Sequence, residues 1–312
     1  MQCQYKRSGT LCGHCQEDLS TVFGSSHCKK CSSLYLFIVV PIAIAGVLMV
    51  VALFVFNITV NSGSFNTFIF YVNMISINYS SFCPNSNSFD CTILSLFNLD
   101  LGIETCFYNG MDDYSKIWLQ LTFPFYLIVI AIALIISSRY SARVQRLTAH
   151  RSIQVLATLF LLSYTKLLLA VCQVLFAFSS IMHLPSQYTK IVWSADASVE
   201  IFGLKFCVLF FICAIIFLFL LICNIALLFP RTVLRIKFIN KFKPFFDAYF
   251  GPYKDNFSFW TGLQLLARAT FYGLTAAQLN QDLVTTSGII LLIILLCLQG
   301  ILRPFKNCFR SL

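Results

Sequence analysis

Four cysteines near the N-terminus have the most regular spacing of any residues in this sequence that could do chemistry. Two residues separate Cys12 from Cys15, two separate Cys28 from Cys31, and twelve lie between the two pairs. Such pairs can hold a tetrahedral zinc ion through four thiolates. They also occur in small disulfide-linked modules, and Cys3 adds a fifth cysteine that a four-ligand site does not need. We favour disulfides here, and zinc is the alternative.

Two basic residues, Lys166 and Arg268, lie inside long apolar runs. A charge at the centre of a membrane helix costs about 2.5–3.5 kcal/mol on insertion scales, so such residues usually face the protein interior. Helical spacing predicts that each shares a face with polar residues: Ser163 and Gln173 with Lys166, and Gln264 and Tyr272 with Arg268. This predicts a polar cavity, pore or anionic-ligand site between the two helices. The alternative is a structural polar contact within the bundle.

A third group of charges lies in the basic, amphipathic segment 231–246. Its apolar residues can face lipid while its cations face lipid headgroups. The cations that we expect to contact headgroups are Arg231, Arg235, Lys237, Lys241 and Lys243. Basic clusters beside a membrane helix bind anionic cytoplasmic lipids. The alternative is an ordinary positively charged cytoplasmic loop.

The composition shows what kind of protein must position these residues. Of 312 residues, 58% are hydrophobic and 11% are charged, whereas soluble domains are about 45–50% apolar and about 25% charged. This excludes a soluble enzyme, a disordered chain and a fibrous repeat. At about 20 apolar residues per span, the chain is predicted to be an all-α, polytopic transmembrane bundle of about seven spans.

The expected spans follow the apolar runs along the chain. They are Leu34–Phe56, Ser64–Phe82, Ile117–Ser137, Ser152–Phe178, Leu204–Phe229, Trp260–Gln278 and Thr285–Leu302. The second is the weakest because Asn66, Asn73 and Asn78 interrupt it. It could instead be a re-entrant or interfacial segment. Asn66 and Asn73 are seven residues apart, which predicts that both amides face the bundle.

The distribution of charge predicts the orientation. With the N-terminus outside, the inner loops carry 13 Lys and Arg residues and the outer segments carry 6, as the positive-inside rule requires. The five N-terminal cysteines and three more, Cys83, Cys91 and Cys106, then all lie on the outer face, where disulfides persist. We therefore expect an extracellular N-terminus and a cytoplasmic C-terminus, with the plasma membrane as the location.

Motifs for catalysis are missing from the sequence. It contains no GxSxG, HExxH, P-loop or dinucleotide fingerprint. We therefore expect no enzyme activity and no cofactor. The net charge of +10 is explained by cytoplasmic loops, so we expect the lipid bilayer, rather than nucleic acid, as the partner.

Several stretches resemble one family. They include SGTLCGHCQEDLSTVFGSSHCKKCS (8–32), FNLDLGIETCFYNGMDDYSKIWLQLTFPFY (97–126) and KPFFDAYFGPYKDNFSFWTGLQLLAR (243–268). They resemble the C-terminal membrane region of large invertebrate cell-surface proteins, which carry Cys-rich EGF-like modules, sometimes with β-helix repeats. The resemblance implies a short Cys-rich module at 1–33, a seven-span domain at 34–302 and a cytoplasmic tail at 303–312. It implies no activity.

Three functions fit these patterns. The first is the core of a receptor-like cell-surface protein, which binds an extracellular ligand through further modules upstream. The second is an ion channel or transporter core, for which Lys166, Arg268 and the Asn-bearing second span are the evidence. The third is the membrane anchor of an adhesion-type ectodomain.

Overall fold

The structure, a computed structural model, is mostly helical. It describes residues 6–8, 12, 14–23, 28–31, 36–82, 107–148, 151–176, 179–183, 189–193, 196, 199–233, 242–276 and 281–306. Within these residues, seven helices have 17 residues or more. They are α1 (Leu36–Phe56), α2 (Gly63–Phe82), α4 (Asp113–Ser137), α6 (Ser152–Leu175), α7 (Leu204–Leu228), α11 (Trp260–Ala276) and α12 (Gln281–Leu302). Each begins and ends close to an apolar run in the sequence.

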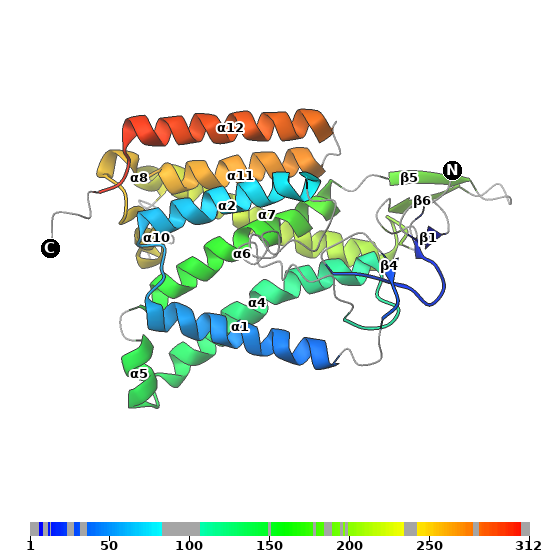
Figure 1. The fold of residues 1–312 in the computed structure, drawn as a ribbon, viewed down its shortest axis with the longest axis horizontal. Helices are drawn as coiled ribbons and strands as arrows, with labels where there is room; N and C mark the ends of the chain where they lie inside the picture. Colours follow the sequence, from blue (N-terminus) through cyan, green and yellow to red (C-terminus); the bar gives the residue numbers. More distant parts are fainter. Residues whose placement is uncertain are drawn as a thin grey trace.

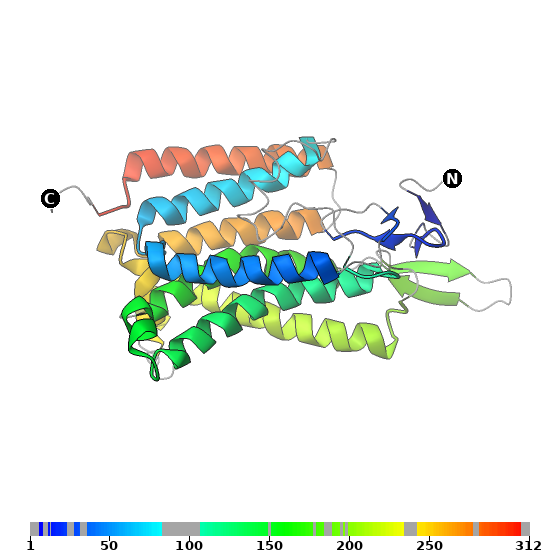
Figure 2. The same cartoon turned by 60° about the horizontal axis from the view of Figure 1, so that its bottom comes forward.

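The long helices lie side by side and alternate in direction, as Figures 1 and 2 show. One end of the bundle carries the N-terminal segment and the hairpin of β5 (Ser179–His183) and β6 (Thr189–Trp193). We call it the cysteine end. The other carries α5 (Ala142–Thr148), α8 (Pro230–Val233), α10 (Lys243–Phe250) and residues 303–306. We call it the basic end, because the exposed Arg143, Arg146 and Lys243 lie there.

Among the residues that the structure describes, four helices are long and apolar enough to cross a membrane. These segments are Val39–Phe56, Asp113–Ser137, Ser152–Leu175 and Leu204–Leu228. The other long helices contain only shorter apolar stretches, such as Phe65–Ile75 and Thr286–Leu302, and α11 is itself only 17 residues long. The bundle is therefore that of a membrane protein, and seven crossings stay a prediction.

The central helix of the bundle is α6. Within the apolar stretch of α6, 89% is buried inside the bundle. The corresponding share in α7 is 28%, although α7 is the more apolar helix. It packs against α4, α7, α10 and α11. A second, smaller core joins α2, α11 and α12 through Phe70, Met74, Phe271 and Leu295. The most hydrophobic helices thus lie at the periphery, where they can face lipid, and α6 lies inside.

The expectation of an all-α fold is too narrow. The antiparallel β5–β6 hairpin lies between α6 and α7, in register from Ser179 opposite Trp193 to His183 opposite Thr189. Two shorter antiparallel pairs fold the N-terminal segment: β1 (Arg7–Ser8) with β2 (His14–Cys15), and β3 (Ser20–Thr21) with β4 (Cys28–Lys29). Segments this short carry too little apolar periodicity to be read from a sequence.

The basic end is closed by the segment between α7 and α11. Phe246 and Tyr249 of α10 are buried against the core, and the Tyr249 hydroxyl donates to the Ala157 carbonyl of α6 at 2.5 Å. Tyr253 pairs with Phe305, with ring centroids 5.3 Å apart. A Cβ on Gly63 would clash with the Phe305 ring, so any larger residue at the start of α2 would push the ring away.

Candidate functional site

The guanidinium of Arg268 lies at the centre of a polar cluster between α2, α6 and α11. Its side chain is fully buried. Nη1 donates to the Thr165 hydroxyl oxygen at 3.5 Å, and the Asn73 amide donates to the same oxygen at 3.1 Å. The Cζ atom lies 5.3 Å from the centroid of the Phe70 ring, a cation–π distance. Three helices therefore share one buried cation.

The polar cluster continues toward the basic end. The amide nitrogen of Asn66 donates to the Tyr253 hydroxyl at 3.0 Å and to the Thr261 hydroxyl at 3.2 Å. All three side chains are buried. Burial raises the pKa of Tyr253 to about 12, although the hydrogen bonds with Thr261 and Asn66 lower it. The hydroxyl therefore stays protonated at neutral pH.

A second branch of the cluster reaches α7. The amide of Asn224 donates to the Tyr164 hydroxyl at 3.2 Å, and that hydroxyl donates to the Leu265 carbonyl at 3.4 Å. Several buried oxygens accept no hydrogen bond within the described residues, among them Ser163 Oγ, Asn224 Oδ1 and Gln264 Oε1. Unpaired polar atoms are costly inside a protein. The presence of several such oxygens shows that the interior around this cluster is polar.

Lys166 lies next to Thr165 in sequence but points elsewhere. Its side chain is only 3% exposed, and Nζ lies 5.2 Å from the centroid of the Phe23 ring. Phe23 belongs to the N-terminal segment. The two cations therefore have different neighbours, because adjacent residues on a helix point in directions about 100° apart. A polar cavity between α6 and α11 that both cations line stays a prediction.

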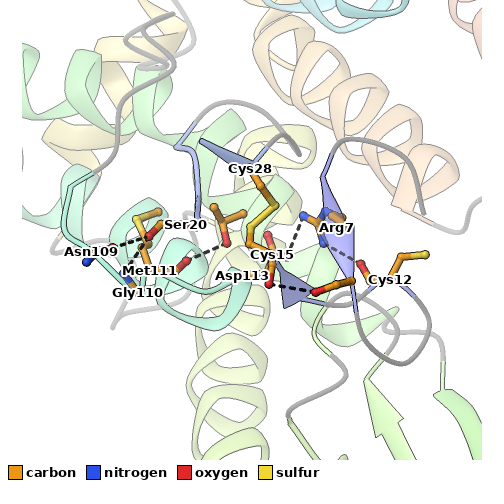
Figure 3. Close-up of a disulfide and its surroundings, with 11 residues drawn as sticks. Arg7, Cys12, Cys15, Ser20, Cys28, Asn109, Gly110, Met111 and Asp113 are labelled. Carbon is orange, nitrogen blue, oxygen red and sulfur yellow. Dashed lines mark hydrogen bonds and ion pairs between the residues drawn. A yellow bond between two sulfur atoms is a disulfide. The ribbon is translucent and has the colours of Figure 1, made fainter. Parts of the chain in front are cut away.

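The N-terminal segment is seated on the bundle by specific contacts at the start of α4 (Figure 3). Both the amide and the hydroxyl of Thr21 donate to the Met111 carbonyl at 2.9 Å. Gly110 donates its amide proton to the Ser20 hydroxyl at 2.8 Å. Residues 20–23 are all buried, so this stretch belongs to the core rather than to a free tail.

An ion pair adds to this docking. Arg7 Nη2 lies 3.0 Å from Asp113 Oδ2, and both side chains are 14% exposed. Asp113 is the first residue of α4, and the Asp112 side chain accepts a hydrogen bond from the Ser115 amide there, which is the arrangement of an N-cap. The N-terminal segment is thereby held to a helix end that is itself well ordered by a cap.

The cysteines of the CxxC pairs form disulfides. Cys15 is bonded to Cys28, and Cys12 and Cys31 are disulfide-bonded as well. These sulfurs hold no thiolate for zinc, and no three His, Cys, Asp or Glu side chains in the described part of the chain gather as metal ligands. Cys3, Cys83, Cys91 and Cys106 lie outside the described residues.

The remaining predicted site residues divide by position. Ser163, Gln264 and Tyr272 are buried, whereas Gln173 is exposed. Placing Gln173 in the interior was wrong, because helical spacing gives the direction of a side chain and not whether a neighbour covers it so near the end of α6. Lys243 is exposed in α10. Arg235, Lys237, Lys241 and the side chain of Arg231 lie outside the described residues.

Sequence reasoning missed the residues that link the parts of the site. Thr165 and Phe23 had no charge and no motif to mark them, and Tyr253 lay in a segment expected to be a loop. The one usable signal was the density of aromatic residues in 245–253, since a loop that is only solvated needs few of them.

Comparisons with protein-family models, curated proteins and solved structures find no match to this chain. The case for function therefore rests on the arrangement of the helices, the buried polar cluster and the docked N-terminal segment.

Proposed function

We propose that the chain is the membrane core of a receptor-like cell-surface protein. In this proposal the disulfide-linked N-terminal segment is extracellular, and its position on the bundle controls the helices. The single observation that carries the proposal is the contact between Phe23 and Lys166. It joins a segment that precedes the first span to the helix at the centre of the bundle.

Displacement of the N-terminal segment would change the surroundings of Lys166. A cation–π contact is worth about 2 kcal/mol or more when it is desolvated. If a ligand or an upstream module pulled Phe23 away, the buried Lys166 ammonium would lose this contact and gain water. Since α6 packs against α10 as well as against α4, α7 and α11, a shift of α6 would reach α10 at the basic end.

The two ends of the bundle support the orientation that we propose. The exposed cations Arg143, Arg146 and Lys243 lie at the basic end, and the described disulfide lies at the other. Positive loops face the cytoplasm, and disulfides persist outside. We propose seven crossings of the plasma membrane, an outer cysteine end, and anionic lipids bound at the cytoplasmic end.

Hydrogen–deuterium exchange in lipid nanodiscs tests this proposal. Phe23→Ala removes the ring beside Lys166, and we expect faster exchange both in α6 and in α10 at the opposite end. Phe37→Ala is the matched control, because Phe37 is 76% exposed at the start of α1. It should leave α10 unchanged.

The other functions predict different results. If the chain is only a membrane anchor, Phe23→Ala should change exchange in residues 6–31 and at the start of α4 alone. That outcome would overturn the receptor proposal. The receptor proposal would also be overturned if Phe23→Ala and Phe37→Ala changed the exchange of the same residues.

A channel or transporter core is the second candidate, favoured by the buried polar cluster. Amides and hydroxyls of α2, α6 and α11 form two hydrogen-bonded groups in the interior, one with Tyr253 and one with Arg268. Whole-cell current recording tests it: a current that Arg268→Gln abolishes or makes less anion-selective would favour this candidate. If neither the wild-type protein nor the Arg268→Gln protein carries a current, the receptor core is favoured.

A further inference from the structure

An apolar cavity lies between α1 and α4 at the cysteine end. Its volume is about 250 Å³. Val39, Ile42 and Ala43 of α1 form one wall, and Leu119 and Phe123 of α4 form the other. It is separate from the polar cluster around Arg268, which belongs to α2, α6 and α11.

The cavity has a floor and a roof. Tyr126 forms the floor, where α1 and α4 come so close that a Cβ on Gly46 would lie 2.9 Å from the Tyr126 ring. Phe23 and Phe107 form the roof, in an edge-to-face pair with centroids 5.2 Å apart. The cavity is therefore closed below by the helices and above by the N-terminal segment.

The polar atoms around the cavity are already paired. The Tyr126 hydroxyl donates to the Ala43 carbonyl at 2.8 Å, and the Thr122 hydroxyl donates to the Trp118 carbonyl at 2.7 Å. A cavity of this kind offers water no partners, and apolar cavities stay dry and accept apolar ligands. The occupant should therefore be a hydrocarbon.

The side of the cavity is continuous with the membrane-facing surface. Thr122 of the lining is exposed, and so are Val40 and Ile44 of α1 and Phe125 of α4, which lie beside or close to lining residues in the sequence. Both helices are candidate membrane spans, so lipid chains surround this edge. Each helix also contains a proline at this level, Pro41 in α1 and Pro124 in α4. Proline within a helix removes a hydrogen bond and bends the axis.

We propose that this cavity binds one acyl chain of a phospholipid from the leaflet at the cysteine end. The chain enters between α1 and α4 and ends beneath Phe23. The cavity is smaller than the about 300–1,000 Å³ of pockets for drug-sized ligands, so its volume favours a slender chain over a bulkier ligand such as a sterol. The bound chain supports the ring that contacts Lys166, so the lipid contributes to the docking of the N-terminal segment.

Photo-crosslinking in nanodiscs tests the proposal. The probe is phosphatidylcholine with a diazirine near the end of one acyl chain, and peptide mass spectrometry locates the crosslinks. We expect crosslinks on the cavity residues Ile42 and Leu119. Ala43→Phe fills part of the cavity and should lower this labelling about tenfold, because the chain loses about two buried methylene groups.

The matched control is Ala45→Phe, since Ala45 is the same residue type on the exposed side of α1. It should leave the labelling of Ile42 and Leu119 unchanged. Should Ala43→Phe fail to fold, Phe123→Leu provides the opposite test: it enlarges the cavity and should raise labelling severalfold. Equal labelling in all of these proteins would mean surrounding bilayer lipid only and would overturn the proposal. So would a photoactivatable sterol that displaces the acyl-chain probe from Ile42 and Leu119.

Discussion

Gly262 of α11 packs directly against the backbone of Leu228 at the end of α7. A Cβ on Gly262 would lie 2.5 Å from the Leu228 nitrogen and 2.6 Å from the Leu227 carbonyl carbon. These atoms are main chain, so they cannot move aside by rotating a side chain. The close approach allows α7 and α11 to enclose Tyr164 and Asn224, whose hydrogen bond joins α6 to α7.

Gly262→Ala should therefore destabilise the bundle by about 1–3 kcal/mol, the usual cost of overpacking. Gly273→Ala in the same helix is the control, because no atom lies within 4 Å of a Cβ there. Alanine favours helix over glycine by about 1 kcal/mol, so the control should be neutral or stabilising. Unfolding in mixed micelles measures both, and equal effects of the two substitutions would contradict this packing.

Thr165→Val tests the link between the three helices at Arg268. Valine keeps the shape of the side chain but removes the oxygen that accepts from Asn73 and Arg268. Hydrogen bonds to charged groups contribute about 1.5–3 kcal/mol, and we expect a loss of stability of that order. Thr270→Val on the exposed side of α11 is the control. A Thr165→Val protein as stable as that control would show that the contact contributes little.

The Arg7–Asp113 ion pair should stabilise the docked N-terminal segment. A double-mutant cycle with Arg7→Gln and Asp113→Asn should give a coupling energy of about 1–3 kcal/mol, because the pair is mostly buried. The Lys306–Asp255 pair is the control, since its side chains are 56% and 93% exposed. Exposed pairs contribute little, so coupling energies of similar size in the two cycles would contradict the expectation.

Removal of the Cys15–Cys28 disulfide should release the N-terminal segment. The bond closes a loop with a sequence separation of 13, and disulfides of this kind typically contribute about 2–4 kcal/mol. Limited proteolysis of the Cys15→Ser/Cys28→Ser protein should cleave within residues 6–31 much faster than in the wild type. Cys207→Ser, at an exposed free cysteine, should leave the cleavage rate unchanged. Slow cleavage in the double variant would show that the contacts of Thr21 and Arg7 suffice.

Much of the architecture could be predicted because hydrophobic runs determine where membrane helices begin and end. The run that ends at Phe56 and the one that begins at Ser152 end and begin at the same residues in the structure. The burial of Arg268 could also be predicted, because lipid is a poor solvent for a charge. These inferences need only the solvent preference of each residue.

The neighbours of each residue could not be predicted in this way. Nothing in the apolar run around Lys166 shows that α6 is the central helix, since a more apolar helix such as α7 faces outward. Nor does the sequence show that Phe23 reaches Lys166, because the two are far apart in the chain and the contact depends on how the bundle assembles. Periodicity gives the direction of a side chain within its helix, and packing decides what it meets.

The pairing of residues 252–254 with 304–306 sets the order in which the protein can be completed during synthesis. The Lys254 amide donates to the Pro304 carbonyl, and the Lys306 amide donates to the Pro252 carbonyl. Residues 304–306 are synthesised after every helix described here, so the loop after α7 cannot pair with them until the chain has been made through α12. The earlier helices can pack as they are made, but this contact at the basic end forms only after α12.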